Sequence, residues 1–225
     1  GIYFLGATSN TITHGYFYAR NWHGIGFYFG SNYNTVSYST GSSDGTLNGG
    51  LIIRNSSYNV VTQSYLAGNT DNYGIEISSS VGNDISFSTI VSNHGTDAAC
   101  TIPPMNNQCP ALWLRNASSN VFTNAYVANP SGFGALIVQS NNNYVDQSTI
   151  TSNSTGKALY LFSGSSNTIN RSVVTNSGRA IEMEGGTFSN TISYSSVTNS
   201  SGDTMVLGTA SSNTLTRTYL LSKSG

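Results

Sequence analysis

Short segments in which every second residue is apolar recur along this chain. Examples are residues 1–4 (GIYF), 74–77 (GIEI), 111–114 (ALWL) and 158–161 (ALYL). Alternation with a period of two over a few residues is typical of a β-strand, whereas an amphipathic helix repeats its apolar positions every three or four residues. The pattern therefore predicts a chain built from many short strands.

An asparagine also recurs at nearly constant spacing. Successive copies are 23 to 25 residues apart, except for one step of 37 residues. An apolar residue stands two positions after every copy, and another stands seven positions after every copy but one, where Gly41 occurs. The nine copies are Asn10, Asn34, Asn59, Asn83, Asn120, Asn143, Asn167, Asn190 and Asn213. Periods of this size mark solenoids.

These positions predict three short strands in each coil and about nine coils in the chain. The expected fold is all-β, a right-handed parallel β-helix, because parallel crossover connections within one sheet are right-handed in nearly all cases. Neighbouring strands lie about 4.8 Å apart, so nine coils would make a rod of about 43 Å. Every coil places its asparagine at the same corner, where we expect the side-chain amides to form a structural ladder of hydrogen bonds.

Two of the repeat segments carry a resemblance to a known family. Residues 164–169 (GSSNTI) and 211–215 (SSNTL) resemble the right-handed parallel β-helix repeats of the pectin-lyase-like superfamily. The resemblance covers the whole chain and is closest to the Asn/Ser/Thr-rich repeats of archaeal and bacterial cell-surface proteins. It implies the fold strongly and the function weakly, because the superfamily includes lyases, glycoside hydrolases, phage tailspikes, adhesins and passive surface proteins.

Charged side chains are scarce in this composition. They make up 8% of the chain, and the formal net charge is −1. Electrostatic attraction to nucleic acid or to an anionic membrane is thereby excluded as a driving force. No run of about 18 apolar residues is present to span a membrane. One continuous repeat without a linker predicts a single domain over residues 1–225.

The 37-residue step contains an insertion at about residues 94–110, which holds the only two cysteines. We expect Cys100 and Cys109 to close this loop as a disulfide, which would stabilise the protein by roughly 2–3 kcal/mol. Disulfides persist in oxidising compartments, so the pattern predicts an extracellular or cell-surface location. The alternative is a metal site formed by the two cysteines with His94.

Acidic residues are few and scattered. The best-placed pair is Asp84 and Asp146, which would lie about 10 Å apart along the axis, near the upper limit for an inverting hydrolase. Glu182, Glu184 and Asp203 form a second loose group. Neither set forms an evident catalytic cluster, so we expect that the chain is not an enzyme and has no cofactor and no metal.

The first strand of most coils is too apolar for a solvent-facing sheet. A sheet with one wet face alternates apolar and polar residues, and contiguous exposed apolar surface marks an interface. The outward positions assigned to this candidate interface are Tyr3, Ile52, Trp113, Ile137, Tyr160 and Val206. The third strand adds the outward tyrosines Tyr16, Tyr65, Tyr126 and Tyr219. Loops that fold over these residues, or ring stacking between coils, would be the alternative explanation.

Five sequences have the Asn-X-Ser/Thr pattern of N-linked glycosylation. They begin at Asn55, Asn116, Asn153, Asn170 and Asn199. We expect them to carry glycans only if the source organism glycosylates its proteins.

The spacing at the ends of the chain suggests a structural function. If a second copy followed the first, its Asn10 would come about one period after Asn213. The sequence therefore predicts an extracellular structural protein, a subunit or segment of a surface fibre formed by end-to-end stacking with copies of itself. The alternative is a carbohydrate-binding or carbohydrate-active β-helix, lyase-like or hydrolase-like, that binds a surface polysaccharide.

Overall fold

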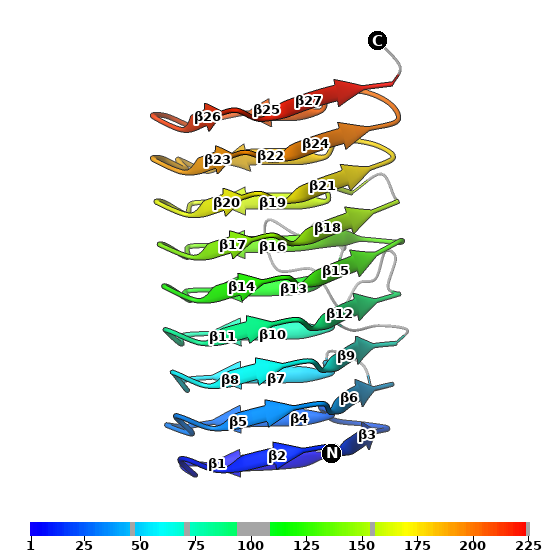
Figure 1. Cartoon of the computed structure of the whole chain (residues 1–225), viewed down its shortest axis with the longest axis vertical. Helices are drawn as coiled ribbons and strands as arrows, with labels where there is room; N and C mark the ends of the chain where they lie inside the picture. The colour runs from blue at the N-terminus through cyan, green and yellow to red at the C-terminus, as the bar shows by residue number, and fades with distance from the viewer. Residues whose placement is uncertain (46–47, 70–72, 94–108, 154–155, 224–225) are drawn as a thin grey trace.

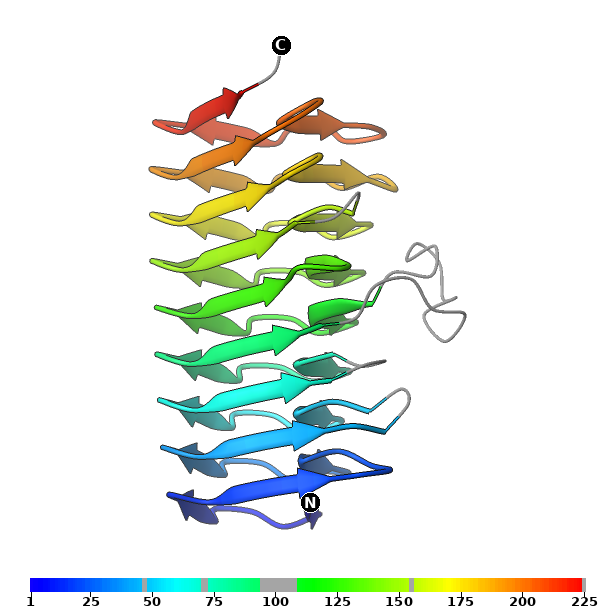
Figure 2. The same cartoon turned by 90° about the vertical axis from the view of Figure 1, so that its right-hand side faces the viewer.

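The computed structural model describes residues 1–45, 48–69, 73–93, 109–153 and 156–223. The chain winds into a β-helix in which each of nine coils supplies one strand to each of three parallel sheets (Figures 1 and 2). Sheet A contains β1 (Ile2–Leu5), β4 (Ile25–Tyr28), β7 (Leu51–Arg54), β10 (Ile75–Ser78), β13 (Pro110–Arg115), β16 (Phe133–Val138), β19 (Leu159–Phe162), β22 (Ile181–Glu184) and β25 (Met205–Leu207).

The other two sheets run along the same axis, and their strands follow those of sheet A in every coil. Sheet B contains β2 (Thr11–Thr13), β5 (Thr35–Ser37), β8 (Val60–Thr62), β11 (Asp84–Ser86), β14 (Val121–Thr123), β17 (Tyr144–Asp146), β20 (Thr168–Asn170), β23 (Thr191–Ser193) and β26 (Thr214–Thr216). Sheet C contains β3 (Tyr16–Ala19), β6 (Thr40–Ser43), β9 (Tyr65–Gly68), β12 (Thr89–Ser92), β15 (Tyr126–Asn129), β18 (Thr149–Ser152), β21 (Val173–Asn176), β24 (Ser196–Asn199) and β27 (Tyr219–Ser222). The predicted fold class, with three strands in each of nine coils, is confirmed.

Inward-facing side chains of the three sheets fill the interior with apolar rows. In sheet A, Ile53 of β7 is in register with Ile77 of β10, and both are fully buried. Each such side chain stabilises the fold by about 1.5–3 kcal/mol. Gly41 interrupts its row in sheet C because a Cβ at this position would lie 2.5 Å from the carbonyl oxygen of Gly50.

The asparagine corner is held by hydrogen bonds along the axis. The carbonyl oxygen of the Asn83 side chain accepts two of them, from the backbone N–H of Asn59 at 2.9 Å and from its Nδ2 at 3.1 Å. The same pair of bonds joins every successive asparagine from Asn10 to Asn213. Each amide thus satisfies buried donors of the coil before it.

Other corners turn through left-handed backbone. At the corner between sheets B and C, Tyr38 and Phe87 have φ values of 49°, a conformation that costs an L-residue about 1–2 kcal/mol. Hydrogen bonds between coils hold these residues in place: the Tyr38 N–H donates to Thr62 and the Phe87 N–H to Thr123. The coil stack therefore imposes the turn on residues that do not favour it.

The connections from sheet C to sheet A vary in length: the one between β6 and β7 is long, whereas the one between β15 and β16 is short. Cys109, at the end of one such connection, is fully buried. Cys100 and His94 lie outside the described residues, and both the disulfide and the single-domain assignment stay predictions. In the described part of the chain there is no helix long and apolar enough to cross a membrane.

Candidate functional site

The outward positions of sheet A bring together the polar chemistry of this chain. The middle outward residues form one row in register from coil to coil: Tyr3, Gly26, Ile52, Glu76, Trp113, Leu136, Tyr160, Glu182 and Val206. A second row, two residues later, includes Tyr28, Arg54, Ser78 and Arg115. Segments that connect sheet C to sheet A pack over these rows, so several outward side chains are buried.

Glu76 is the centre of the first cluster, and it is 1% exposed. Arg54 binds both of its carboxylate oxygens at 3.1 Å, and Arg115 lies 3.7 Å away. The Tyr73 hydroxyl donates a third contact to Glu76 at 2.8 Å. A buried carboxylate requires this kind of pairing. Burial and the neighbouring Glu76 carboxylate raise the pKa of Tyr73, so its phenol stays protonated and donates to Glu76.

His23 extends the cluster toward the first coils. Its ring is buried, and burial lowers its pKa to about 4, so the imidazole is neutral near pH 7. The Gly49 N–H donates to Nδ1 at 2.9 Å, which assigns the ring proton to Nε2. The ring lies 6.3 Å from that of Tyr73 and 6.2 Å from that of Tyr28. His23 therefore presents a neutral donor within a row of aromatic rings.

A second ionic cluster lies in the seventh and eighth coils. Glu182 is buried and is paired with Arg179 and, at 3.5 Å, with Lys157. Burial alone would raise the pKa of Glu182, but the hydrogen bond from Arg179 and the charge of Lys157 outweigh it and lower the pKa. Lys157 also lies over the ring of Tyr160, 4.3 Å from its centroid, and the Tyr160 hydroxyl donates to Glu184 at 2.8 Å.

Two hollows flank these clusters. One, with a volume of about 490 Å³, opens beside the second cluster and is lined by Lys157, Gly178, Arg179, Ser201, Gly202 and Asp203. The other, of about 310 Å³, has a wholly apolar lining near the first coil: Tyr3, Leu5, Trp22, Tyr28 and Phe29. Tyr3 stacks on Tyr28 at 5.9 Å there. Exposed aromatic platforms beside paired charges form a surface suited to sugars, which present both apolar faces and polar groups.

The predicted interface residues do not form an exposed face in the structure. Ile52, Trp113 and Tyr160 point outward but are buried, and Tyr3 is the most exposed at 38%. Val206 is half-buried. The assignment of Ile137 was wrong: it pairs with inward-facing Leu114 and lies in the core. Covering segments therefore account for much of the apolar character of this face.

The structure does not bring Asp84 and Asp146 together as an acid pair. They occupy different rows of sheet B, in strands separated by β14. Burial raises the pKa of Asp84. A hydrogen bond from Arg171 lowers the pKa of Asp146, so the two carboxylates lie in different local environments.

Of the glycosylation sequences, Asn55, Asn116 and Asn153 are exposed and Asn170 is half-buried. Asn199 is 2% exposed, and its Nδ2 donates to the carbonyl groups of Ser201 and Gly202. A glycan on Asn199 would have no room in the folded chain.

Comparison with known proteins identifies the family. The family model described as right-handed beta helix region matches residues 99–220, more than half of the chain. The chain belongs to the right-handed β-helix family. No curated protein matches it at significant similarity.

Solved structures of β-helix proteins share the fold at low sequence identity. A point mutant of the periplasmic alginate epimerase AlgG is 12% identical, with a TM-score of 0.58, over 88% of this β-helix and 62% of the epimerase. Unmutated AlgG is 11% identical with a TM-score of 0.56 over the same shares. The A-module of an Azotobacter vinelandii mannuronan C-5 epimerase is 10% identical with a TM-score of 0.40, over 90% of this chain and 70% of the module. This β-helix thus spans less than two thirds of the length of AlgG.

These comparisons correct one prediction from the sequence. The expectation that the chain is not an enzyme is contradicted, because the structures that match its fold include the alginate epimerase AlgG. The expectation rested on the scatter of the acidic residues along the sequence. The Glu76 cluster consists mainly of arginine, tyrosine and histidine side chains, which are far apart in sequence.

Proposed function

We propose that this β-helix is a carbohydrate-active protein that holds an acidic polysaccharide along the outer face of sheet A. The observation that carries the proposal is the arrangement around Glu76. The side chains of Arg54 and Arg115 are 40% and 34% exposed, while their shared partner Glu76 is buried. Two guanidinium groups with one carboxylate between them leave an excess positive charge that faces the solvent. Arginine binds sugar carboxylates as it binds protein carboxylates, through paired N–H donors.

The surroundings of this cluster suit a polymer. Arg54 and Arg115 occupy the same row with Ser78 between them, so they lie about 9.6 Å apart along the axis. The apolar hollow at Tyr3 and Trp22 lies along the same face and would support sugar rings by stacking. AlgG, which shares the fold, is named an alginate epimerase.

The test uses alginate and polygalacturonate as probes. Binding is measured by isothermal titration calorimetry at low salt, and turnover by solvent deuterium incorporation at the sugar carbon next to the carboxylate. We expect Arg115→Gln to weaken binding about tenfold, which corresponds to about 1.4 kcal/mol. Lys223→Gln is the matched control, since it removes an exposed positive charge far from sheet A. Equal loss in both variants, or no binding of either polymer by the wild type, would refute the proposal.

A polysaccharide partner agrees with the predicted extracellular or cell-surface location. Deuterium incorporation would assign proton abstraction to this site, whereas binding without incorporation or chain cleavage would make the protein a carbohydrate-binding one. End-to-end stacking into a filament stays a prediction.

A further inference from the structure

Sheet C presents a row of exposed tyrosines on its outer face. Tyr16, Tyr65 and Tyr126 occupy one position in the first, third and fifth coils, and Thr40 and Thr89 occupy it in the coils between. The tyrosines are 74%, 46% and 45% exposed. Because they are two coils apart, their rings recur about every 9.6 Å along the axis. This distance is comparable to the length of a disaccharide in an extended chain.

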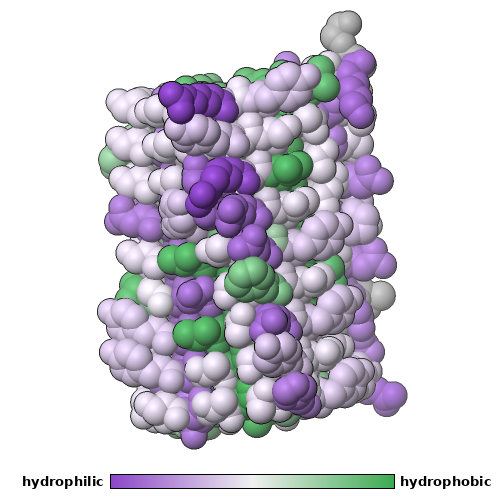
Figure 3. Space-filling model, viewed as in Figure 1, coloured by the Kyte–Doolittle hydropathy of each residue, from purple (hydrophilic) through white to green (hydrophobic). Residues whose placement is uncertain are grey.

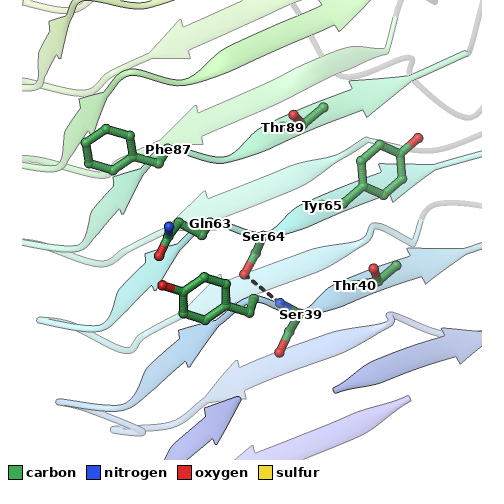
Figure 4. A pocket seen from close by; sticks show the side chains of 8 residues that line it. Ser39, Thr40, Gln63, Ser64, Tyr65, Phe87 and Thr89 are labelled. Atoms are coloured by element: carbon green, nitrogen blue, oxygen red, sulfur yellow. Dashed lines mark hydrogen bonds between the residues drawn. The ribbon is translucent and has the colours of Figure 1, made fainter. Parts of the chain in front are cut away.

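A groove runs beside this row. This first hollow has a volume of about 430 Å³. Its lining residues are Tyr38, Ser39, Thr40, Gln63, Ser64, Tyr65, Phe87 and Thr89. Figure 4 shows Tyr65 on one side of this hollow and Gln63 and Phe87 on the other, with Ser64 between them. Its backbone is rigid there, since the Ser39 N–H donates to the Ser64 hydroxyl.

Two further hollows lie on the opposite side of the tyrosine row, toward the C-terminal ends of the sheet C strands. One of about 330 Å³ shares Tyr65 with the first, and one of about 390 Å³ includes Tyr126. Both are lined by Ala128 and Pro130. Outward residues of the neighbouring row, Val91, Ala128 and Thr151, line these two hollows. The tyrosine row is therefore flanked by shallow hollows on both sides over several successive coils.

The wall of the groove contains residues that the fold itself does not favour. Tyr38 and Phe87 adopt left-handed backbone, which is uncommon for bulky side chains, and they are 52% and 62% exposed. Asn124 occupies the equivalent corner one coil after Phe87 with a φ of 52°. Tyr38 stacks on His14 with the ring centroids 5.1 Å apart, and the rings of Tyr38 and Phe87 both keep exposed surface that a ligand can contact.

Among the residues that the structure describes, those that line the three hollows carry no charged side chain. They supply rings, hydroxyl groups and the side-chain amides of Gln63, Asn69, Asn93 and Asn153. The face seen in Figure 3 is pale over much of its area, and its most strongly hydrophilic residues lie in a column down the middle of the view. Such a lining can stack on sugar rings and hydrogen-bond their hydroxyl groups, but it offers no counter-charge for a carboxylate or sulfate.

We propose that the outer face of sheet C carries a second carbohydrate site, which binds an extended, uncharged polysaccharide along the axis of the β-helix. Tyr16, Tyr65 and Tyr126 stack on alternate sugar units, and the corner side chains Tyr38 and Phe87 form one wall. The site is separate from sheet A and does not depend on the function proposed there.

The test measures binding of cellohexaose, xylohexaose and mannohexaose to the whole chain by isothermal titration calorimetry. We expect at least one of these uncharged hexasaccharides to bind, and Tyr65→Ala and Tyr126→Ala each to weaken binding about tenfold. Tyr58→Ala is the matched control: this tyrosine is 50% exposed but lies at another corner, stacked on Tyr33. Arg115→Gln should leave hexasaccharide binding unchanged.

Three results would overturn the proposal. The first is that none of the hexasaccharides binds at millimolar concentration. The second is that Tyr58→Ala weakens binding as much as Tyr65→Ala does. The third is self-association of the wild type, seen by analytical ultracentrifugation and abolished by Tyr65→Ala without any sugar binding. That result would make the row a contact between copies of this chain.

Discussion

The outer faces of sheets A and C are built on the same coil period, yet their surfaces differ. On sheet A, long connections cover the strands, so that Glu76, Glu182 and His23 are buried among ion pairs and rings. On sheet C, the preceding corner is a tight turn, as at Tyr38 and Ser39, and the tyrosine row stays open. The comparison teaches that in a solenoid the connections, more than the strands, decide whether a face gains buried charge or remains an open surface.

The largest effect expected from this contrast is on the pH dependence of stability, and it comes from the buried side chain of His23. Its pKa is about 4 in the folded chain and about 6.5 when unfolded, so between these values the unfolded state binds more protons. The free energy of unfolding should therefore fall as the pH falls from about 6.5 to about 4, by on the order of 3 kcal/mol. Urea unfolding at several pH values in this range measures the effect: the free energy of unfolding should depend less steeply on pH in His23→Gln than in the wild type. An unchanged slope would mean that the ring is already hydrated in the folded protein.

Removing the buried charge of sheet A should have the next largest effect. Glu76→Gln leaves Arg54 and Arg115 without their carboxylate, and we expect a loss of about 2 kcal/mol of unfolding free energy. This is below the 3–5 kcal/mol typical of a fully buried pair because water reaches both guanidinium groups. Asp203→Asn is the control, since Asp203 is 71% exposed in its pair with Arg179. Similar losses in both variants would show that the cover over Glu76 contributes little.

Salt should separate the two proposed sites. Binding of alginate at Arg54 and Arg115 should weaken about tenfold when the ionic strength rises from about 0.05 to about 0.5 M, because screening acts on charge pairs. Binding of an uncharged hexasaccharide at Tyr65 should change less than about twofold over the same range. Titrations of both probes at the two ionic strengths check this. Equal salt dependence would remove the distinction between the faces.

The smallest expected effect concerns the strained corner beside sheet C. Phe87→Asn should raise the free energy of unfolding by about 0.5–1 kcal/mol, because asparagine tolerates left-handed backbone. The same variant should weaken hexasaccharide binding, so stability and binding move in opposite directions. Tyr65→Asn, in a strand with ordinary backbone, should weaken binding without the gain in stability. Thermal unfolding of both variants checks this. An equal gain in stability in Phe87→Asn and Tyr65→Asn would mean that backbone strain is not the cause.

The fold could be predicted from the sequence because its determinants repeat. The asparagine corner and the apolar residues two positions later appear in every coil, so each copy reinforces the same interpretation. A serine five residues after most asparagines repeats as well, and its hydroxyl accepts from the neighbouring coil, as Ser64 does from Ser39. This second signal was present in the sequence but was not used.

The site could be predicted only in part because its members do not repeat. Tyr73 and His23 come from connections of irregular length, and their contact with the strands depends on how those connections fold back. Arg54 and Glu76 are 22 residues apart, which is short of one period, so counting in whole coils does not pair them. Ile137 was misplaced for a related reason: alternation alone does not say which of two adjacent apolar residues faces outward.

The asparagine corner gives the rod a unit of length. The hydrogen bonds from one asparagine side chain to the next all run in the same direction along the axis, from Asn10 toward Asn213. A partial coil would break this one-way series, whereas a whole coil inserts without disturbing it. Gene duplication can therefore lengthen such a chain in steps of one period, and each step moves a tyrosine or arginine by one strand spacing of about 4.8 Å. The distance between sugar contacts on this protein would therefore change in evolution only by whole numbers of coils.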